Sequence, residues 1–409
     1  MAFKFVHTAD IHLDSPLSSL ALRDAGLAEL VGNATRTTFT RIVDLCLGEQ
    51  VQALLIAGDL YDGRQTSMKT ARFLAQQMER LDAAGIPAFV IRGNHDASSR
   101  ITRELTLPDS VKVFPGRAET VETAWNGHPV AVHGISFRDP HAPDSLLDRF
   151  HQPVPGAFNI GLLHTSLGGA QGHDPYAPCT LADLRATGFD YWALGHIHRR
   201  EAHPGPTTVV MPGIPQGRDI GEGGAKSVTL VSVCDDGAVA LAERSLAVAQ
   251  FERLPVDCRQ VSEWGDLIDR LKQALRQARR DHGGEHLIVR PVLTGATPLA
   301  WRVGRDADLL LAEAQRTSEE IGTLWIDKIE ITLDPDTASP PWRCGRRSGP
   351  YRRAGRSAAH RSRRPRGGGA PAQASPTRTA QHVRRQRGTD RRHRCPGDAA
   401  RRDRGAGAS

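Results

Sequence analysis

One local pattern recurs along the chain: a short apolar run that ends in a polar cluster. Six such runs are Phe3–Val6, Ala53–Ala57, Ala88–Ile91, Val130–Val132, Ile160–Leu163 and Tyr191–Leu194. Each has the length of a β-strand and leads into Gly, Asp, Asn or His. Between the first three runs, apolar residues over 39–46 and 74–81 recur at helical spacing. This alternation predicts a layered α/β fold whose polar residues gather at the carboxyl ends of the strands.

Later segments predict how the chain divides. Runs at Thr208–Met211 and Val228–Val233 predict strands that close a first domain, residues 1–240. A second unit, residues 245–336, carries a helical apolar stripe over 267–275, for which Ser262 is a candidate cap. The remaining elements expected there are strands at Glu285–Leu293 and Leu324–Leu333, with a helix around Asp306–Glu320. The second unit is therefore expected to be a small α/β domain.

Residues 340–409 differ in kind. They hold 20 of the 53 basic residues, all of them Arg, but only three acidic residues, so residues 1–339 carry a net charge of −10 although the whole chain is +7. The tail lacks apolar periodicity and is expected to be disordered. It could bind nucleic-acid phosphate. The alternative hypothesis, favoured by the loss of Lys after Lys328, is that a frameshift replaced the original C-terminal segment.

The remaining bulk features concern the cellular setting. The six cysteines form no CxxC pair, and a chain of this length needs no disulfide framework. The N-terminus reaches Asp10 and His12 too early for a signal peptide, and no apolar run approaches the roughly 20 residues of a membrane span. A soluble, cytoplasmic protein without membrane contact is expected. His7 and His133 lie outside the motif spacings and are expected to be structural.

Five of the polar clusters carry metal-binding residue types. They are Asp10-Ile11-His12, Gly58-Asp59-Leu60-Tyr61-Asp62, Gly93-Asn94-His95-Asp96, the single His164, and Gly195-His196-Ile197-His198. The i, i+2 spacing in the first and last motifs directs both side chains to one face. Seven candidate ligands result: Asp10, His12, Asp59, Asn94, His164, His196 and His198. Tyr176, in the loop that follows His164, is a candidate for lining the substrate cleft.

The chemistry of this set favours two metal ions. Carboxylate, imidazole and amide ligands suit Mn²⁺, Fe²⁺, Zn²⁺ or Mg²⁺ rather than a thiolate-loving metal. Seven ligands are too many for one tetrahedral zinc, but they suit two ions about 3.5–4 Å apart that share a carboxylate. Such a pair lowers the pKa of a bridging water and clamps the oxygens of a phosphoryl group. The set therefore predicts a metal-dependent phosphoesterase.

The order of these motifs resembles the calcineurin-like metallophosphoesterase superfamily. The opening His-Thr-Ala-Asp-Ile-His-Leu, together with residues 163–167 and 212–218, is similar to the double-strand-break repair exonuclease branch of SbcD and YhaO type. The likeness covers about residues 3–235 and, more loosely, extends to 335. It implies β-sheets flanked by helices, a small capping domain that helps to grip DNA, and Mn²⁺ as the usual metal. It also implies an SMC-like coiled-coil ATPase of SbcC or YhaN kind as partner, and a homodimer is possible.

The resemblance also implies a role for each matching residue. One metal would be held by Asp10, His12, Asp59 and His198, and the second by the shared Asp59 with Asn94, His164 and His196. His95 would face the scissile phosphate and support the transition state or the leaving group. Either Asp62 or Asp96 could orient His95, and the sequence does not rank them.

Three functions remain open at this point. The leading hypothesis is a Mn²⁺-dependent DNA nuclease, exonuclease or endonuclease, in double-strand-break repair. The first alternative is a phosphatase or cyclic-nucleotide phosphodiesterase on the same site, against which the extra domain after residue 245 argues. The second is a non-catalytic repair scaffold, against which the complete ligand set and His95 argue.

Overall fold

A computed structural model describes residues 2–15, 25–61, 67–97, 106–168 and 175–335, with only the backbone fixed for 25–30. The tail from residue 340 onward and Asp62 lie outside the described residues, so the expectations about them stay predictions. Within the described part, no helix is both long enough and apolar enough to cross a membrane. The four cysteines in this part are unpaired thiols: Cys46, Cys179, Cys234 and Cys258.

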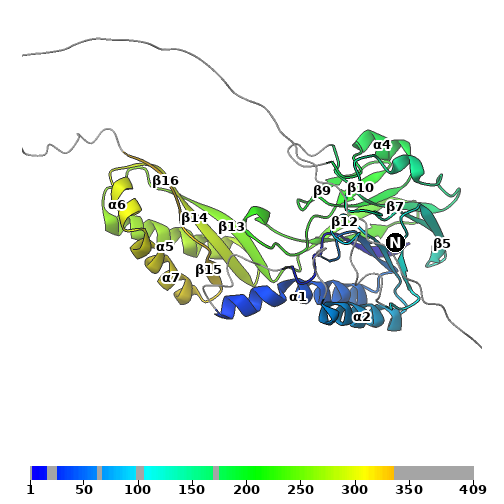
Figure 1. Ribbon diagram of the computed structural model, residues 1–409, viewed down its shortest axis with the longest axis horizontal. Coiled ribbons are helices and arrows are strands. Elements are labelled where there is room, and N and C mark those ends of the chain that lie inside the picture. The colour runs from blue at the N-terminus through cyan, green and yellow to red at the C-terminus, as the bar shows by residue number, and fades with distance from the viewer. Residues whose placement is uncertain (1, 16–24, 62–66, 98–105, 169–174, 336–409) are drawn as a thin grey trace, which may run out of the picture. The chain divides into compact units, whose positions relative to one another are not determined.

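The first sheet has six strands in the order β12-β11-β1-β2-β3-β4. Their bounds are Val239–Arg244, Val228–Val233, Phe3–Thr8, Ala53–Ala57, Ala88–Ile91 and Val111–Val113. Strands β1 to β4 are parallel, and β11 and β12 extend the sheet antiparallel. The parallel strands are joined by helices α1 (Ala25–Glu49) and α2 (Met68–Ala83), which lie side by side against one face of the sheet (Figure 1). The predicted alternation of strand and helix is confirmed here.

The second sheet also has six strands, in the order β5-β6-β7-β8-β10-β9. Their bounds are Glu119–Trp125, His128–Gly134, Phe158–His164, Tyr191–Gly195, Thr208–Met211 and Glu201–His203. Strands β6, β7, β8 and β10 are parallel, and the two edge strands run antiparallel to their neighbours. A short helix, α4 (Leu181–Ala186), precedes β8 and is closed at its N-terminus by a capping box from Thr180 and Asp183.

The two sheets pack face to face, and alternate residues of each strand divide between two cores. In β2, Leu55 faces the second sheet, whereas Leu54 and Ile56 face α1 and α2. The core between the sheets is rich in aromatic residues; Phe5 of β1 meets Tyr191 of β8 edge to face at 5.2 Å between ring centroids. Because both faces of these strands are covered, the strands read as continuous apolar runs. The fold class predicted from sequence is confirmed.

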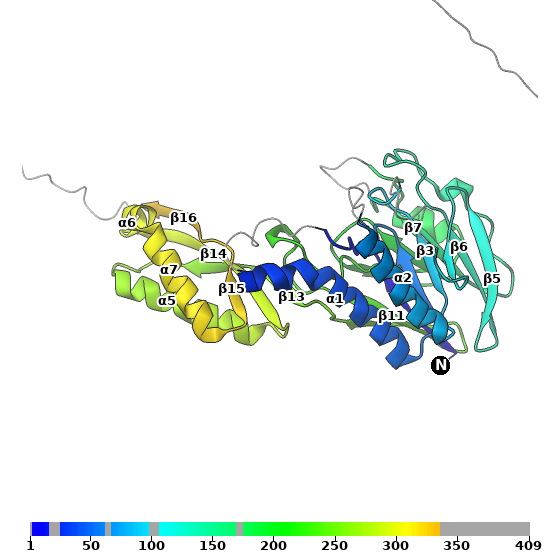
Figure 2. The same cartoon turned by 60° about the horizontal axis from the view of Figure 1, so that its bottom comes forward.

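A third sheet belongs to the segment after residue 245. It contains β13 (Ala249–Asp257), β14 (His286–Thr297), β15 (Leu324–Ile326) and β16 (Glu330–Pro335), all parallel. Helices α5 (Trp264–Asp281), α6 (Ala300–Arg305) and α7 (Ala307–Ile321) share a core with this sheet (Figure 2). The predicted division near residue 245 falls in the connection between β12 and β13. The domain limits themselves remain a proposal.

Two local predictions in this segment were wrong. Ser262 does not cap α5, because the N-cap lies one residue later, at Glu263, and makes no side-chain capping bond. The strand expected over Leu324–Leu333 is two strands that pair successively with β14. The pairing offset changes by one residue between Leu287↔Leu324 and Val292↔Glu330. The extra residue makes a bulge near Asp327, which ends β15 and starts a new register in β16.

Candidate metal centre

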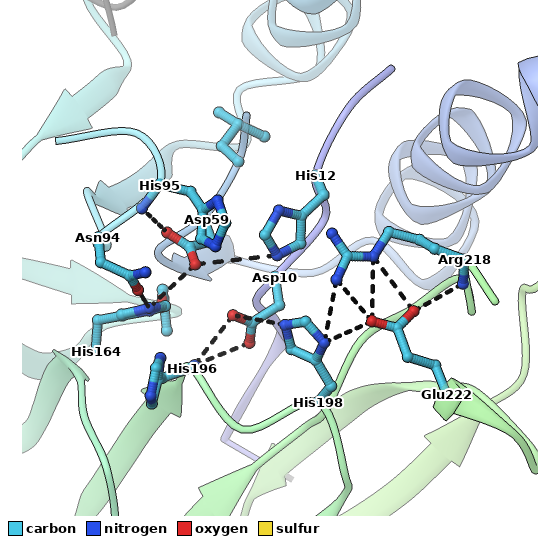
Figure 3. Close-up of polar contacts among 12 residues, drawn as sticks. Asp10, His12, Asp59, Asn94, His95, His164, His196, His198, Arg218 and Glu222 are labelled. Carbon is cyan, nitrogen blue, oxygen red and sulfur yellow. Dashed lines mark hydrogen bonds and ion pairs between the residues drawn. The ribbon is translucent and has the colours of Figure 1, made fainter. Parts of the chain in front are cut away.

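The candidate ligands meet where the carboxyl ends of strands from both sheets converge. Backbone hydrogen bonds hold the loops together: the amide of Asp10 donates to the carbonyl of Gly58 (2.9 Å), and that of His12 to the carbonyl of Asp59 (3.0 Å). The amide of His196 donates to both oxygens of the Asp10 carboxylate, at 3.1 and 2.9 Å. All seven predicted ligands therefore come together in one place (Figure 3).

Two buried carboxylates form the middle of the cluster. Asp10 is fully buried and Asp59 is 2% exposed. Asp59 Oδ2 lies 3.3 Å from His164 Nε2 and 3.9 Å from His12 Nε2, so it faces ligands of both predicted metals. Two groups of three residues bring their donor atoms within 4.8 Å of one another: Asp10, His12 and His198, and Asp10, Asp59 and His164. Asp10 is thus shared between the groups in the same way as Asp59 is shared in the predicted assignment.

His164 is held with one ring nitrogen directed into the cluster. Its Nδ1 lies 2.9 Å from the carbonyl oxygen of Ala57, and its Nε2 lies 3.0 Å from Asn94 Oδ1. A carbonyl can only accept, so Nδ1 carries the proton and donates it to Ala57. Nε2 faces the oxygens of Asp59 and Asn94, so a proton on this nitrogen, or a metal ion in its place, is held between acceptors.

The other imidazoles surround the carboxylates. The ring centroid of His12 lies 5.3 Å from that of His198 and 4.8 Å from that of His95, and both pairs meet edge to face. The ring of His196 lies 5.2 Å from that of His164 and 5.0 Å from that of Tyr176. Tyr176, singled out as a candidate for the cleft, therefore packs directly on a candidate ligand.

The backbone is held in an unfavourable conformation at four of the seven candidates. The φ angles of Asp10, His12, Asp59 and His196 are 51°, 46°, 51° and 104°. The left-handed region costs a non-glycine residue about 1–3 kcal/mol and persists only where the surrounding structure enforces it. Such strain gathers at functional sites, and here it turns the side chains away from the strands and toward one another.

Close approach explains the glycines of these motifs. A Cβ atom on Gly93 would lie 2.3 Å from Asp59 Oδ1 and 2.6 Å from His164 Nε2. On Gly58 it would lie 2.4 Å from His164 Nδ1. Both positions must therefore lack a side chain if His164 and Asp59 are to occupy their places.

Burial and mutual charge shift the pKa values of the cluster. Burial lowers the pKa of His12 and of His196 to about 3, so both imidazoles are neutral and able to ligate. Burial opposes the charge of Asp59, but the nearby His164 outweighs it and holds the pKa of Asp59 below its usual range. Burial also disfavours the protonated form of His164, yet Asp59 raises the pKa of His164 to about 9. Burial raises the pKa of Asp10.

These residues fit a pair of divalent cations. Two carboxylates buried side by side are unfavourable unless positive charge compensates them. Around them lie four imidazoles and the amide oxygen of Asn94, which are the oxygen and nitrogen donors that Mn²⁺, Fe²⁺ and Zn²⁺ accept. The donor chemistry, the burial and the strained backbone all agree with a metal centre.

His95 differs from the candidate ligands because its side chain is exposed. Its amide donates to Asp59 Oδ1 at 2.9 Å, which fixes the loop while leaving the ring at the open side of the site. Asp96, one of the two acids proposed to orient it, is buried and accepts a hydrogen bond from the amide of Leu60 at 2.9 Å. Asp96 therefore ties the loop after β3 to the loop after β2; its proposed action on His95 stays a prediction.

Two further residues at this site did not emerge from the sequence as participants. Glu222 Oε1 lies 2.7 Å from Nδ1 of His198, and Arg218 binds the Glu222 carboxylate through several hydrogen bonds (Figure 3). Burial opposes the charge of Glu222, but hydrogen bonds from His198 and Arg218 hold its pKa well below the usual range. Arg218 had been noted only as the end of a family-like run. Nothing in the local pattern around Glu222 distinguishes it.

His7 and His133 lie outside the cluster of candidate ligands and bond to groups of the two-sheet core. His7 is fully buried, with Nδ1 2.9 Å from the Tyr191 hydroxyl and Nε2 3.1 Å from the carbonyl of Leu194. His133 lies 3.0 Å from both Thr120 Oγ1 and Asn159 Oδ1.

The fold and this cluster define a metallophosphoesterase, and comparison with known proteins agrees. The family described as calcineurin-like phosphoesterase matches residues 3–200, and the middle domain of metallophosphoesterase YhaO matches residues 251–334. The chain is 31% identical over 343 residues to the metallophosphoesterase YhaO of Bacillus subtilis (strain 168), covering 81% of each chain. The protein belongs to the calcineurin-like metallophosphoesterases, within which it is YhaO-like.

More distant similarity extends to proteins named for DNA repair. The DNA double-strand break repair protein Mre11 of Sulfurisphaera tokodaii is 26% identical over 203 residues, which is 48% of this chain and 49% of that protein. Mre11 of Methanocaldococcus jannaschii is 27% identical over 205 residues, 48% of this chain and 51% of that protein. The chain therefore spans about half the length of these Mre11 proteins.

Proposed function

We propose that this metallophosphoesterase is a DNA phosphodiesterase, an exonuclease or endonuclease that acts in double-strand-break repair. The observation that carries the proposal is the convergence of two carboxylates, four imidazoles and one amide in a cluster whose centre is buried, with His95 exposed at its edge. The similarity to Mre11 proteins supports DNA as the substrate.

In this proposal, Asp10, His12, Asp59 and His198 would hold one ion, and Asp59, Asn94, His164 and His196 would hold the other, with Mn²⁺ as the preferred metal. The ions would lower the pKa of a water between them and neutralise charge on the phosphoryl oxygens. The position of Asp59 Oδ2, which faces both His164 and His12, supports a shared ligand.

His95 is the proposed catalytic group. The neighbouring ligands Asp59 and His12 are buried, whereas His95 is exposed, with its ring centroid 4.8 Å from that of His12. An imidazole at this position can donate a hydrogen bond or a proton to the oxygen that leaves the phosphorus. The hydrogen bond from the backbone amide of His95 to Asp59 fixes the position of this backbone beside the metal ligands.

The remaining parts of the proposal concern partners and location. The small domain, residues 245–336, would be the capping domain that helps to hold DNA, and an SMC-like ATPase of SbcC or YhaN kind would be the partner. A homodimer and a cytoplasmic location stay predictions.

A phosphatase or cyclic-nucleotide phosphodiesterase remains the competing function, because the same metal cluster can hydrolyse small esters. The deciding experiment gives the purified protein Mn²⁺ with end-labelled duplex and hairpin DNA, and separately with a p-nitrophenyl phosphodiester. Cleavage of DNA that is lost in Asp59→Ala and in His95→Ala is the expected result. Hydrolysis of the small ester alone, lost in the same variants, would overturn the nuclease proposal.

A further inference from the structure

The two ring nitrogens of His198 face opposite sides of the site. Nε2 lies 3.9 Å from Asp10 Oδ1, on the ligand side, and Nδ1 lies 2.7 Å from Glu222 Oε1, on the other side. Arg218 donates hydrogen bonds to both oxygens of the Glu222 carboxylate, so Glu222 is the acceptor in this short contact and Nδ1 of His198 is the donor. The lone pair of Nε2 is then directed toward Asp10 and is free to bind a metal.

Glu222 is itself held by Arg218. The Arg218 Nε lies 3.1 and 3.2 Å from the two carboxylate oxygens, and its Nη2 donates to Oε1 at 2.6 Å. The backbone amide of Arg218 donates to Oε2 at 2.7 Å. With both oxygens bound, the carboxylate cannot rotate away from His198.

The segment that carries this pair is anchored on the small domain. The amide of Gly224 donates to the carbonyl of Phe251 in β13 at 2.9 Å. Two residues before Arg218, the buried side chain of Gln216 donates to the carbonyl of Ala249 at 2.8 Å and accepts from the amide of Val248 at 2.8 Å. The start of β13 therefore fixes the place from which Glu222 reaches His198.

We infer that Glu222, locked by Arg218, is a positioning residue that sets the tautomer and direction of the metal ligand His198. The other ligand His164 donates from Nδ1 to the backbone carbonyl of Ala57, and no substitution removes this acceptor. His198 instead depends on a replaceable side chain. The inference rests on the metal centre of the function proposed above; it adds Glu222, which no sequence motif contains, and gives Arg218 a role.

The test is Mn²⁺ binding, measured by titration calorimetry and by metal content per chain. Loss of a carboxylate partner of a ligating histidine typically weakens metal binding about 10–100-fold. Glu222→Ala should weaken one Mn²⁺ site by this factor and leave the other within a few-fold. Glu222→Gln keeps an acceptor oxygen for Nδ1 and should lie between Glu222→Ala and the wild type.

Asp327→Asn is the matched control. Asp327 is also a largely buried carboxylate bound by an arginine, with Arg290 Nε 2.6 Å from its Oδ2, but it lies in the small domain. The Asp327→Asn protein should bind both ions as the wild type does. Unfolding curves of all variants identify those that fail to fold. Two ions bound with unchanged affinity by folded Glu222→Ala would overturn the inference alone. A wild-type protein that binds fewer than two ions would overturn the metal centre itself.

Discussion

A single methyl group added at Gly93 should abolish the metal centre without unfolding the protein. The Cβ atom of Gly93→Ala would lie 2.3 Å from Asp59 Oδ1 and 2.6 Å from His164 Nε2. Carbon and oxygen atoms normally stay about 3.3–3.6 Å apart, so the Asp59 carboxylate would have to move by about 1 Å. Gly93 does not have a positive φ, so the effect of the substitution is steric alone.

The size of this displacement decides the outcome. Metal–ligand distances of about 2.0–2.2 Å tolerate only about ±0.2 Å, so a shift of 1 Å breaks the bond between Asp59 and a metal. Misplacement of reacting groups by this amount reduces turnover by about 10²-fold. Excess volume in a packed site costs only about 1–3 kcal/mol of stability.

The assay compares Mn²⁺ content, phosphodiester hydrolysis and urea unfolding of Gly93→Ala with those of Gly32→Ala. Gly32 lies on the exposed side of α1, where an added Cβ meets no atom within 4 Å. Gly32→Ala should keep its activity, and its free energy of unfolding should rise by about 0.5–1 kcal/mol, because alanine favours the helix. The reasoning is refuted if Gly93→Ala binds two Mn²⁺ ions with wild-type affinity and hydrolyses substrate at the wild-type rate.

Three further predictions concern separate parts of the structure. His95→Asn should retain two Mn²⁺ ions but lose about 10²–10⁴-fold in hydrolysis; loss of metal instead would place His95 among the ligands. Burial lowers the pKa of His7 to about 3, so as the pH falls below about 6.5 the unfolded chain gains a proton that the folded chain does not, and stability decreases. Between pH 7 and pH 5 this loss is about 2 kcal/mol, and urea unfolding of metal-free His7→Gln should lack it; equal pH dependence in both proteins contradicts the assignment. Gln216→Met leaves the buried amide of Val248 without its acceptor and should lower the free energy of unfolding by about 1–3 kcal/mol. It should also weaken one Mn²⁺ site. If stability falls but both Mn²⁺ sites keep their affinity, the contact with the small domain does not control His198.

The elements that the sequence predicted are those with a strong local signal. Runs such as Ala53–Ala57 and Ala88–Ile91 are apolar throughout because both of their faces are covered, and their strand bounds agree with the structure. The edge strands β4, β5, β9, β12 and β13 were not predicted, because they are short or partly exposed and alternate less clearly. The bulge near Asp327 was missed because it depends on the register of a neighbouring strand, which has no local sequence pattern.

The sequence by itself determined the fold class and the identity of the candidate ligands. Metal-binding side chains follow strand ends at short, fixed spacings, and carboxyl ends of parallel strands meet at one edge, so the motifs could be recognised before the structure. Only the tertiary structure decided which groups hold these ligands in place. Ala57, 107 residues away in the sequence, orients His164, and Glu222, 24 residues away, orients His198. Hydrogen bonds of this kind depend on where distant segments come together in space, which no local pattern encodes.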